Sequence, residues 1–473
     1  MLKMLILATS FLTGATGLAY QTYWQKYLSY LVGSESRSIS LIVGVFLLGL
    51  AAGYEFWGRV TQKYIKKNEL LRTYSYIEFA IGMYVILFPS YFTLLEKIVF
   101  STPRNFLIDL VVTIFALLIP TFLMGGTIPI LTAYLPNNIK EVNDSHIKVY
   151  GINTIGAFFG VFLGLFLIGS VGLKNSIILT GLFNIIIGIF YFFAKDNRDI
   201  HFNESIPVVE NKLSSKFIYA FVGITGCVSL TFEVLSVRSL GLAIGMNIYV
   251  FPMILSIFIL GLGYGPISLL KKNYTIRDIV FEIQKLLFFF VLAYISIPYW
   301  PTIFSNYRVM FSDSIGSFWM YYFLVYLTMC LILLPSILSF GRMIPMAYSL
   351  INRSGDEVGV ICGRVYFFNT LGTIVGAFLF GHLFLYFLNL EGIFILSILL
   401  LLCCLTFVLV KQNYNQLAHL PTVFILCLII LIPLGRESHW VGLFRTRVQT
   451  GKHFKVQKIT SNFISGIIIL FEK

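Results

Sequence analysis

The stretch Tyr150-Gly-Ile-Asn153-Thr154-Ile-Gly156 returns 216 positions later as Tyr366-Phe-Phe-Asn369-Thr370-Leu-Gly372. A second block returns at an offset of 212, where Thr13-Gly14 matches Thr225-Gly226. Two blocks repeated at nearly one offset indicate an internal duplication. We therefore expect a fold made of two related halves.

The composition indicates an integral membrane protein. Hydrophobic residues make up 58% of the 473 residues and charged residues 12%, and the mean hydropathy is +0.87. A soluble chain carries about twice that share of charge. We predict thirteen membrane spans, over residues 4–32, 38–59, 73–93, 105–135, 149–170, 175–195, 216–245, 247–270, 281–299, 317–339, 360–388, 391–410 and 417–434. The first run is too long for a signal peptide, and Pro120 predicts a kink in the fourth span.

The predicted spans divide into two repeats of six helices each. An even number of spans per half makes both halves enter the membrane with the same polarity, as the two halves of major-facilitator transporters do. The predicted fold class is therefore an all-α membrane protein of major-facilitator type. We expect a first repeat over 1–195, a cytoplasmic linker over 196–216, a second repeat over 217–410, an additional membrane helix over 411–435 and a short polar tail over 436–473, with a β-hairpin-like pattern.

Basic loops predict the orientation of the chain. Arg59, Lys63, Lys66, Lys67 and Arg72 lie between the second and third spans, which predicts a cytoplasmic loop and a cytoplasmic N-terminus. The expected location is a bacterial cytoplasmic (inner) membrane. The net charge of +13 then reflects loops that meet anionic lipid, not nucleic acid. Thirteen spans place the tail outside, whereas its own basic residues favour the inside, so the span at 417–434 is the weakest.

Four pairs of glycines recur at a spacing of four residues inside the predicted spans. The pairs are Gly49 with Gly53, Gly156 with Gly160, Gly261 with Gly265, and Gly372 with Gly376. This spacing gives one helix face without side chains, so that helix backbones can approach closely. Tight packing is the favoured interpretation, and a sliding surface for alternating access is the alternative.

Polar residues inside spans are candidates for a functional site because each is costly in hydrocarbon. Gln21 and Glu233 occupy the same repeat position, and Lys26 and Arg238 follow five residues later in each half. Glu233 could pair with Arg238 or with a basic group from another helix. The alternative is a structural ion pair, with Lys26 and Arg238 reaching the interface.

Further polar groups fall into a matched set and two single residues. The matched set is Tyr150, Asn153 and Thr154 in the first half and Tyr366, Asn369 and Thr370 in the second. Each triplet shares one helix face, which favours helix–helix hydrogen bonds over a cavity lining. Glu78 is either an interface residue or a proton-coupling carboxylate. For His382 a packing role is favoured over a proton relay.

Tyr20 and Trp24 lie beside Gln21 in the first span. Aromatic faces near an acidic group suit an organic cation, so Tyr20, Gln21, Trp24, Lys26, Glu233 and Arg238 form the candidate substrate site. Glu78, Glu233 and His382 are the candidates for proton coupling. The six cysteines lack metal-ligand spacing, and neither a catalytic motif nor a cofactor fingerprint is found, so we expect no metal and no cofactor.

The motifs resemble the membrane region of fused major-facilitator/spermidine-synthase-like proteins. The resemblance rests on residues 14–53 with Tyr20-Gln21 and Trp24-Gln25-Lys26, on 225–265 with Phe232-Glu233-Val234 and Arg238, and on 120–129, 150–160 and 364–376. Gln21 stands where the family has an acid and Ser236 where it has a tryptophan. The soluble synthase domain is missing, so the resemblance carries no enzymatic activity to this chain.

These observations predict a transporter-like membrane protein. The resemblance implies polyamines, or other small organic solutes, as substrates. One alternative is a membrane anchor or partner for a separate synthase-like enzyme, with the tail as the docking element. Another is the membrane half of an enzyme acting on a lipid or an exported substrate. Membrane lipid, a small organic cation and a separate synthase-like protein are thus the expected partners.

Overall fold

The structure is a computed structural model that describes residues 2–32, 36–64, 66–101, 106–196, 198, 214–245, 249–270, 274–311, 315–351 and 357–411. The predicted span at 417–434 and the polar tail at 436–473 lie outside the described residues. Within those residues every long element is a helix, and twelve segments are long and apolar enough to cross a membrane. The predicted all-helical multi-pass fold is thus confirmed.

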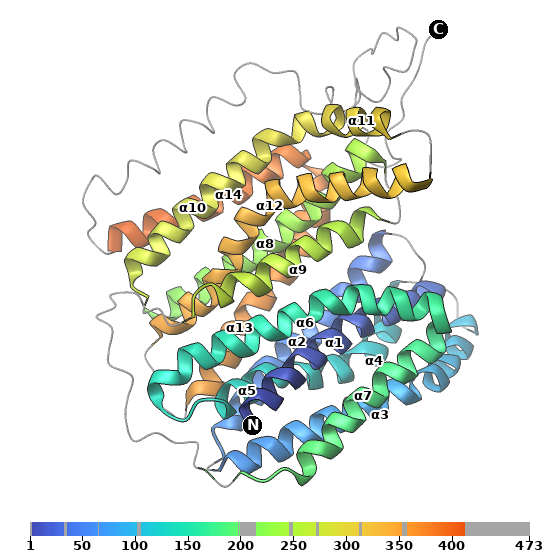
Figure 1. Cartoon of the computed structure of the whole chain (residues 1–473), viewed down its shortest axis with the longest axis vertical. Helices are drawn as coiled ribbons and strands as arrows, with labels where there is room; N and C mark the ends of the chain where they lie inside the picture. The colour runs from blue at the N-terminus through green and yellow to red at the C-terminus, as the bar shows by residue number, and fades with distance from the viewer. Residues whose placement is uncertain are drawn as a thin grey trace, which may run out of the picture.

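The first half contains six spanning segments built from seven α-helices. They are α1 (Leu2–Val32), α2 (Ser36–Thr61), α3 (Lys67–Phe100), α4 (Phe106–Met124), α5 (Thr127–Tyr134), α6 (Val142–Val171) and α7 (Leu173–Phe193), with the short 3-10 helix η1 (Ile139–Glu141) before α6. The first half fills the lower part of the view in Figure 1.

The second half fills the upper part of the same view. Its helices are α8 (Ser215–Ile244), α9 (Val250–Ile267), α10 (Ile276–Ser296), α11 (Trp300–Met310), α12 (Ile315–Leu350), α13 (Val358–Val375) and α14 (Leu390–Lys411), with short helices η2 (Ile297–Tyr299), η4 (Gly376–Leu383) and η5 (Phe384–Tyr386). Several helices extend beyond the predicted spans. The span predicted at 317–339 runs to Leu350, for example, because the helix continues through Arg342 and Pro345 beyond its most apolar part.

The fourth span is interrupted at Gly125-Gly126, between α4 and α5, and not at Pro120, which lies inside α4. Proline lacks an N–H and frees the carbonyl four residues earlier. The hydroxyl of Tyr84 on α3 donates to that carbonyl, on Ala116, at 2.9 Å. A neighbouring helix thus satisfies the freed group, which keeps α4 helical through its proline.

The duplication seen in the sequence is reproduced in the helix contacts. A methyl group on Gly156 would lie 1.9 Å from the carbonyl oxygen of Phe11, and one on Gly372 would lie 1.8 Å from that of Gly223. Phe11 and Gly223 are themselves 212 residues apart. Gly160 and Gly376 repeat the pattern one turn further along. Helix pairs α1–α6 and α8–α13 are therefore the same packing unit, built twice.

The other two glycine pairs also make matching contacts in the two halves. Gly53 lies against Phe122 of α4 and Gly125 just after it, and Gly265 lies against Leu338 and Gly341 of α12 at the matching positions. The partners of Gly49 and Gly261 on these helices match in the same way. All eight glycines thus lie where a neighbouring helix approaches to backbone or close side-chain contact.

The two halves meet along α2 with α13 and along α6 with α9. At the end that carries Lys3, Lys67 and Arg198, called the basic face below, the contact between halves is made by backbone. A methyl group on Gly363 of α13 would lie 2.1 Å from the carbonyl oxygen of Tyr54 on α2. The halves therefore touch closely near the basic face.

Candidate functional site

A cavity of about 150 Å³ lies inside the first half, between α1, α2, α3, α6 and α7 and the junction of α4 with α5. The lining residues that carry polar side-chain groups are Thr13, Thr16, Tyr54, Glu78, Thr127, Asn153 and Asn184. One water needs roughly 15 Å³ of such space. The cavity therefore has room for several waters or a small cation beside a single carboxylate.

Glu78 is the only acidic residue in the lining of this cavity, and it is fully buried. The side-chain amide of Asn184 on α7 donates to Glu78 Oε2 at 2.6 Å. The hydroxyl of Tyr20 on α1 donates to Asn184 Oδ1 at 2.6 Å, and Thr127 of α5 donates to Glu78 Oε1 at 3.4 Å. Glu78 therefore lies inside the helix bundle, bonded by neutral side chains from α5 and α7.

Polar groups continue from Glu78 toward the basic face. Tyr74 precedes Glu78 by about one turn of α3 and packs its ring on Tyr191 of α7, with centroids 5.3 Å apart. Tyr191 and Thr9 of α1 are joined by a hydrogen bond between their hydroxyls of 3.0 Å. The Tyr74 hydroxyl is buried and has no hydrogen-bond partner among the described residues. Glu78, Thr9 and Thr13 are the polar side chains around it.

The same region of the second half is apolar. Phe232 occupies the repeat position of Tyr20, and its ring contacts Phe258, Phe290, Phe340 and Phe394. Most buried residues in the middle of α10 and α14 are apolar, namely Ile283, Leu286, Leu287, Phe290, Ile398, Leu401, Leu402 and Leu405, beside the buried polar residues Ser397 and Glu282. The surroundings of Phe232 are therefore apolar, whereas the hydroxyl of Tyr20 is linked through Asn184 to a carboxylate.

The structure separates the residues of the predicted substrate site. Tyr20 and Trp24 are fully buried in the first half, with their rings 5.5 Å apart. Glu233 lies on α8 of the second half, and no hydrogen bond or ion pair joins it to any described residue, Gln21 included. Gln21 is half-buried and Lys26 exposed.

Arg238 does not pair with Glu233 in this conformation. Its guanidinium Nη2 donates to the carbonyl oxygen of Gly381 in η4 at 3.0 Å. Glu233 is half-buried and keeps a carboxylate without a partner among the described residues. The side chain of His382 lies outside the described residues.

The matched triplets contribute contacts within and between the halves. The Asn153 amide donates to the Ser10 carbonyl oxygen of α1 at 2.9 Å, whereas the Thr154 hydroxyl bonds within its own helix. The Asn369 carbonyl oxygen lies against Gly226 at the matching place, and Thr370 is buried. Asn153 thus both bonds α6 to α1 and lines the cavity.

Tyr150 and Tyr366 meet across the boundary between the halves. Their ring centroids are 5.3 Å apart. The Tyr366 hydroxyl forms a hydrogen bond of 3.0 Å with Nε2 of the buried His146 on α6. Arg364 of α13 lies 3.7 Å from Glu55 of α2, which also bonds Arg59. These contacts add polar links to the glycine packing near the basic face.

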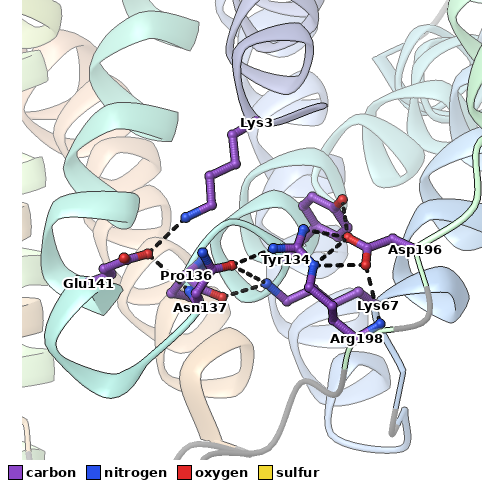
Figure 2. A network of polar contacts seen from close by, with 8 residues as sticks. All are labelled: Lys3, Lys67, Tyr134, Pro136, Asn137, Glu141, Asp196 and Arg198. Carbon is purple, nitrogen blue, oxygen red and sulfur yellow. Dashed lines mark hydrogen bonds and ion pairs between the residues drawn. The ribbon is translucent and has the colours of Figure 1, made fainter. Parts of the chain in front are cut away.

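A polar network fastens the helix ends of the first half at the basic face (Figure 2). Arg198 donates to both carboxylate oxygens of Asp196 and to Asn137 Oδ1 at 2.7 Å. Tyr134 donates to Asp196 at 2.7 Å. The Arg198 guanidinium holds the pKa of the Asp196 carboxyl well below its usual range, and the Tyr134 hydroxyl adds to that effect. In the same network Lys67 Nζ donates to the Pro136 carbonyl oxygen at 2.6 Å.

The second half has its own buried ion pair near the basic face. Arg342 of α12 donates to Glu282 of α10 at 3.0 Å and to the Ser268 hydroxyl of α9 at 2.9 Å. Ser339 donates to the same Glu282 oxygen at 2.7 Å. Every group in this cluster has a partner, so it joins three helices and leaves no free carboxylate.

Sequence reasoning identified Glu78 but missed Asn184, Tyr74 and Tyr191. The signal available for Asn184 was its position as an amide in the middle of the apolar run 175–195. The two tyrosines carry no such signal, because tyrosine is frequent in this chain and common in membrane spans.

No family model matches the sequence, and a search of curated proteins gives no match either. Solved structures do match. A bacterial homologue of the iron transporter ferroportin, in an outward-facing state, superposes with a TM-score of 0.55 at 12% identity, over 88% of this chain and 100% of that one. The Escherichia coli fucose:proton symporter FucP gives a TM-score of 0.54 at 13% identity, over 86% and 98%.

A second structure of FucP, described as a major facilitator superfamily transporter in the outward conformation, gives 0.54 at 11% identity, over 86% and 97%. At such identities these likenesses show the fold alone. The chain is a multi-pass membrane protein with the transporter-like architecture of the major facilitator fold, as its duplicated halves predict.

Proposed function

We propose that this chain is a secondary transporter that moves a small organic cation by alternating access of its two halves. The halves are of similar construction and are joined by glycine-rich contacts along α2–α13 and α6–α9. Polyamines are the first candidates, on the strength of the sequence resemblance to the fused synthase-like family. With the basic face in the cytoplasm, the N-terminus is cytoplasmic in a bacterial inner membrane.

The observation that supports this proposal most is the buried carboxylate of Glu78 in the cavity of the first half, whereas the matching surroundings of Phe232 in the second half are apolar. A carboxylate in the interior of a membrane protein is costly unless it is protonated or neutralised by a cation. Its bonded partners, Asn184 and Thr127, are neutral. Because the matching surroundings of Phe232 in the second half are apolar, helix packing at this place does not require an acid, which supports a role in coupling.

Glu233 supports the choice of a cationic solute. It is half-buried on α8 and has no positive partner among the described residues. A positively charged amine that reached it between the halves would supply the missing counter-charge. Glu78 would then couple the movement of the halves to a proton, and Glu233 would contact the solute.

Flux of labelled putrescine or spermidine into proteoliposomes with an imposed pH gradient tests the proposal. The wild type is expected to accumulate the amine, Glu78→Gln to lose the response to the gradient, and Glu233→Gln to lose binding. Glu282→Gln is the matched control for charge removal at a buried acid, and it should retain gradient-driven flux in the fraction that folds. Absence of flux for every organic cation tried would contradict the proposal.

A further inference from the structure

We propose that protons reach Glu78 from the basic face through the interior of the first half, along a track of hydroxyls in which Tyr74 is the switch. The track is formed by Thr9, Tyr191 and Tyr74, and it is separate from the path between the halves that a solute would take. This inference rests on the proposed coupling role of Glu78 and adds the route by which its proton arrives.

The entrance of the track lies near the basic face. Tyr191 is in the last turn of α7, which ends at Phe193, and its hydroxyl bonds Thr9 at 3.0 Å. Thr9 is half-buried, whereas Tyr191 and Tyr74 are fully buried. A hydroxyl can both donate and accept a hydrogen bond, so it can receive one proton while it releases another.

The track is interrupted at Tyr74 in this conformation. The Tyr74 hydroxyl lies close to Thr9, Thr13 and Glu78, but it forms no hydrogen bond of full geometry with any of them. A buried hydroxyl without a partner is unfavourable by a margin comparable to a lost hydrogen bond. A small movement of α3 against α1 or α7 would give Tyr74 partners on both sides and connect Thr9 to Glu78.

Proton balance along the completed track is simple. A hydronium ion at the basic face supplies one proton and becomes water, and each hydroxyl passes on its own proton as it receives the next. One proton arrives at the Glu78 carboxylate, which becomes a neutral acid, and no hydroxyl keeps a charge. The other titratable groups facing Glu78 are Tyr20 from α1 and Tyr191 from α7, and Asn184 and Thr127 are neutral.

The second half again provides an internal comparison. Thr9 matches Phe221 at the offset of 212, and the buried residues of α10 include Ile283, Leu286 and Leu287 beside the ion-paired Glu282. The second half therefore has a phenylalanine in place of the entrance hydroxyl, and its buried carboxylate on α10 is neutralised by Arg342. A purely structural role for the hydroxyls would predict similar polarity in both copies.

Infrared spectroscopy of proteoliposomes after a rapid drop in pH tests the track without any solute. The protonation band of Glu78 is identified as the band that Glu78→Gln lacks. Tyr74→Phe keeps the ring against Tyr191 and removes the hydroxyl, so it should slow protonation of Glu78 on the order of 10²-fold. Tyr84→Phe, on the same helix but outside the track, should protonate at the wild-type rate.

Each outcome bears on one proposal. A folded Tyr74→Phe variant with the wild-type protonation rate overturns the track, whatever the transport assay shows. If Tyr74→Phe does not fold, Thr9→Val removes the entrance hydroxyl with little change of shape, and a wild-type rate there overturns the track equally. Slow protonation in Tyr74→Phe without any solute flux in the wild type would support the track and contradict the transporter.

Discussion

At the scale of single residues, the informative feature is a polar group present in only one of two copies. Tyr20, Glu78 and Asn184 form a hydrogen-bonded chain in the first half. In the second half, Phe232 occupies the repeat position of Tyr20 and packs within a cluster of phenylalanines. Since both copies share backbone contacts, the polar chain is a feature added to the fold and not a requirement of it.

Removing one member of this set of hydrogen-bonded side chains should destabilise the protein. Asn184→Leu leaves the Tyr20 hydroxyl and the Glu78 carboxylate each without their partner, at about 1–3 kcal/mol per unsatisfied group. Thermal unfolding in detergent should therefore show a lower Tm for Asn184→Leu than for the wild type. An unchanged Tm would mean that these bonds are not made in solution.

Replacing all three residues with apolar ones should restore stability. The triple variant Tyr20→Phe, Glu78→Leu and Asn184→Leu copies the apolar surroundings of Phe232 and removes both partners of each of the two bonds to Asn184 together. Replacing both partners of a hydrogen bond by apolar groups is close to neutral. The triple variant is expected to unfold at a higher temperature than Asn184→Leu, and a lower temperature would contradict the comparison of the halves.

At the scale of helices, packing depends on glycines that face a neighbouring backbone. A methyl group on Gly156 of α6 would lie 1.9 Å from the Phe11 carbonyl oxygen, whereas one on Gly169 of the same helix would meet nothing within 4 Å. Gly156→Ala is expected to destabilise by about 1–3 kcal/mol, and Gly169→Ala to be neutral or stabilising. Equal Tm values for these two variants would show that α1 and α6 do not pack this closely.

The network at the basic face predicts a dependence on pH. Because the pKa of Asp196 is lowered in the folded protein, its contribution is fully present above the ordinary pKa of aspartate, about 4. That contribution is lost as the pH falls through the lower folded value. Arg198 is half exposed, so the contribution is about 1 kcal/mol or less.

Asp196→Asn should therefore lower the Tm at pH 7, and the difference from the wild type should shrink as the pH falls below about 4. Tyr134→Phe removes one of the bonds to Asp196 and should show a smaller loss at pH 7. A difference that grows toward acid pH would contradict the sign of this assignment.

Sequence patterns predicted the helices well because apolar length and repetition are local properties. The spans and the parallel duplication follow from residues 13–53, 150–160 and their copies. Helix ends were less accurate, since α12 continues past Arg342 into a region where that charge is paired with Glu282. A charge in a sequence does not reveal whether another helix will neutralise it.

The candidate site was predicted only in part. Glu78 was a candidate because an acid in a span is rare, whereas Asn184, Tyr74 and Tyr191 become meaningful only when α1, α3 and α7 meet. A search for matched residues also favours what the two copies share. Here the site lies where the copies differ, so the repeat that predicts the fold does not point to the cavity.

At the scale of the whole molecule, alternating access requires the halves to separate near the basic face. Gly359 of α13 and Thr61 of α2 are in contact across the boundary, with the built Cβ of Gly359 2.9 Å from Thr61 Cβ. Disulfides need Cβ atoms about 3.5–4.5 Å apart. In a chain freed of its six cysteines, Thr61→Cys with Gly359→Cys should cross-link after a slight shift.

Oxidation of this pair should stop transport, because the cross-link holds the halves together, and a reducing agent should restore it. Each single cysteine variant serves as a control and should be insensitive to the oxidant. Full transport by the cross-linked protein would show that these helices need not part during the cycle.

The most direct measurement of the central claim compares gradient-driven uptake of an organic cation by the wild type and by the triple variant with the apolar chemistry of the second half. Both proteins are reconstituted in the same vesicles, and the folded fraction of each is measured. The account predicts uptake by the wild type and loss of its response to the pH gradient in a folded triple variant. Equal gradient-driven uptake by both would contradict it.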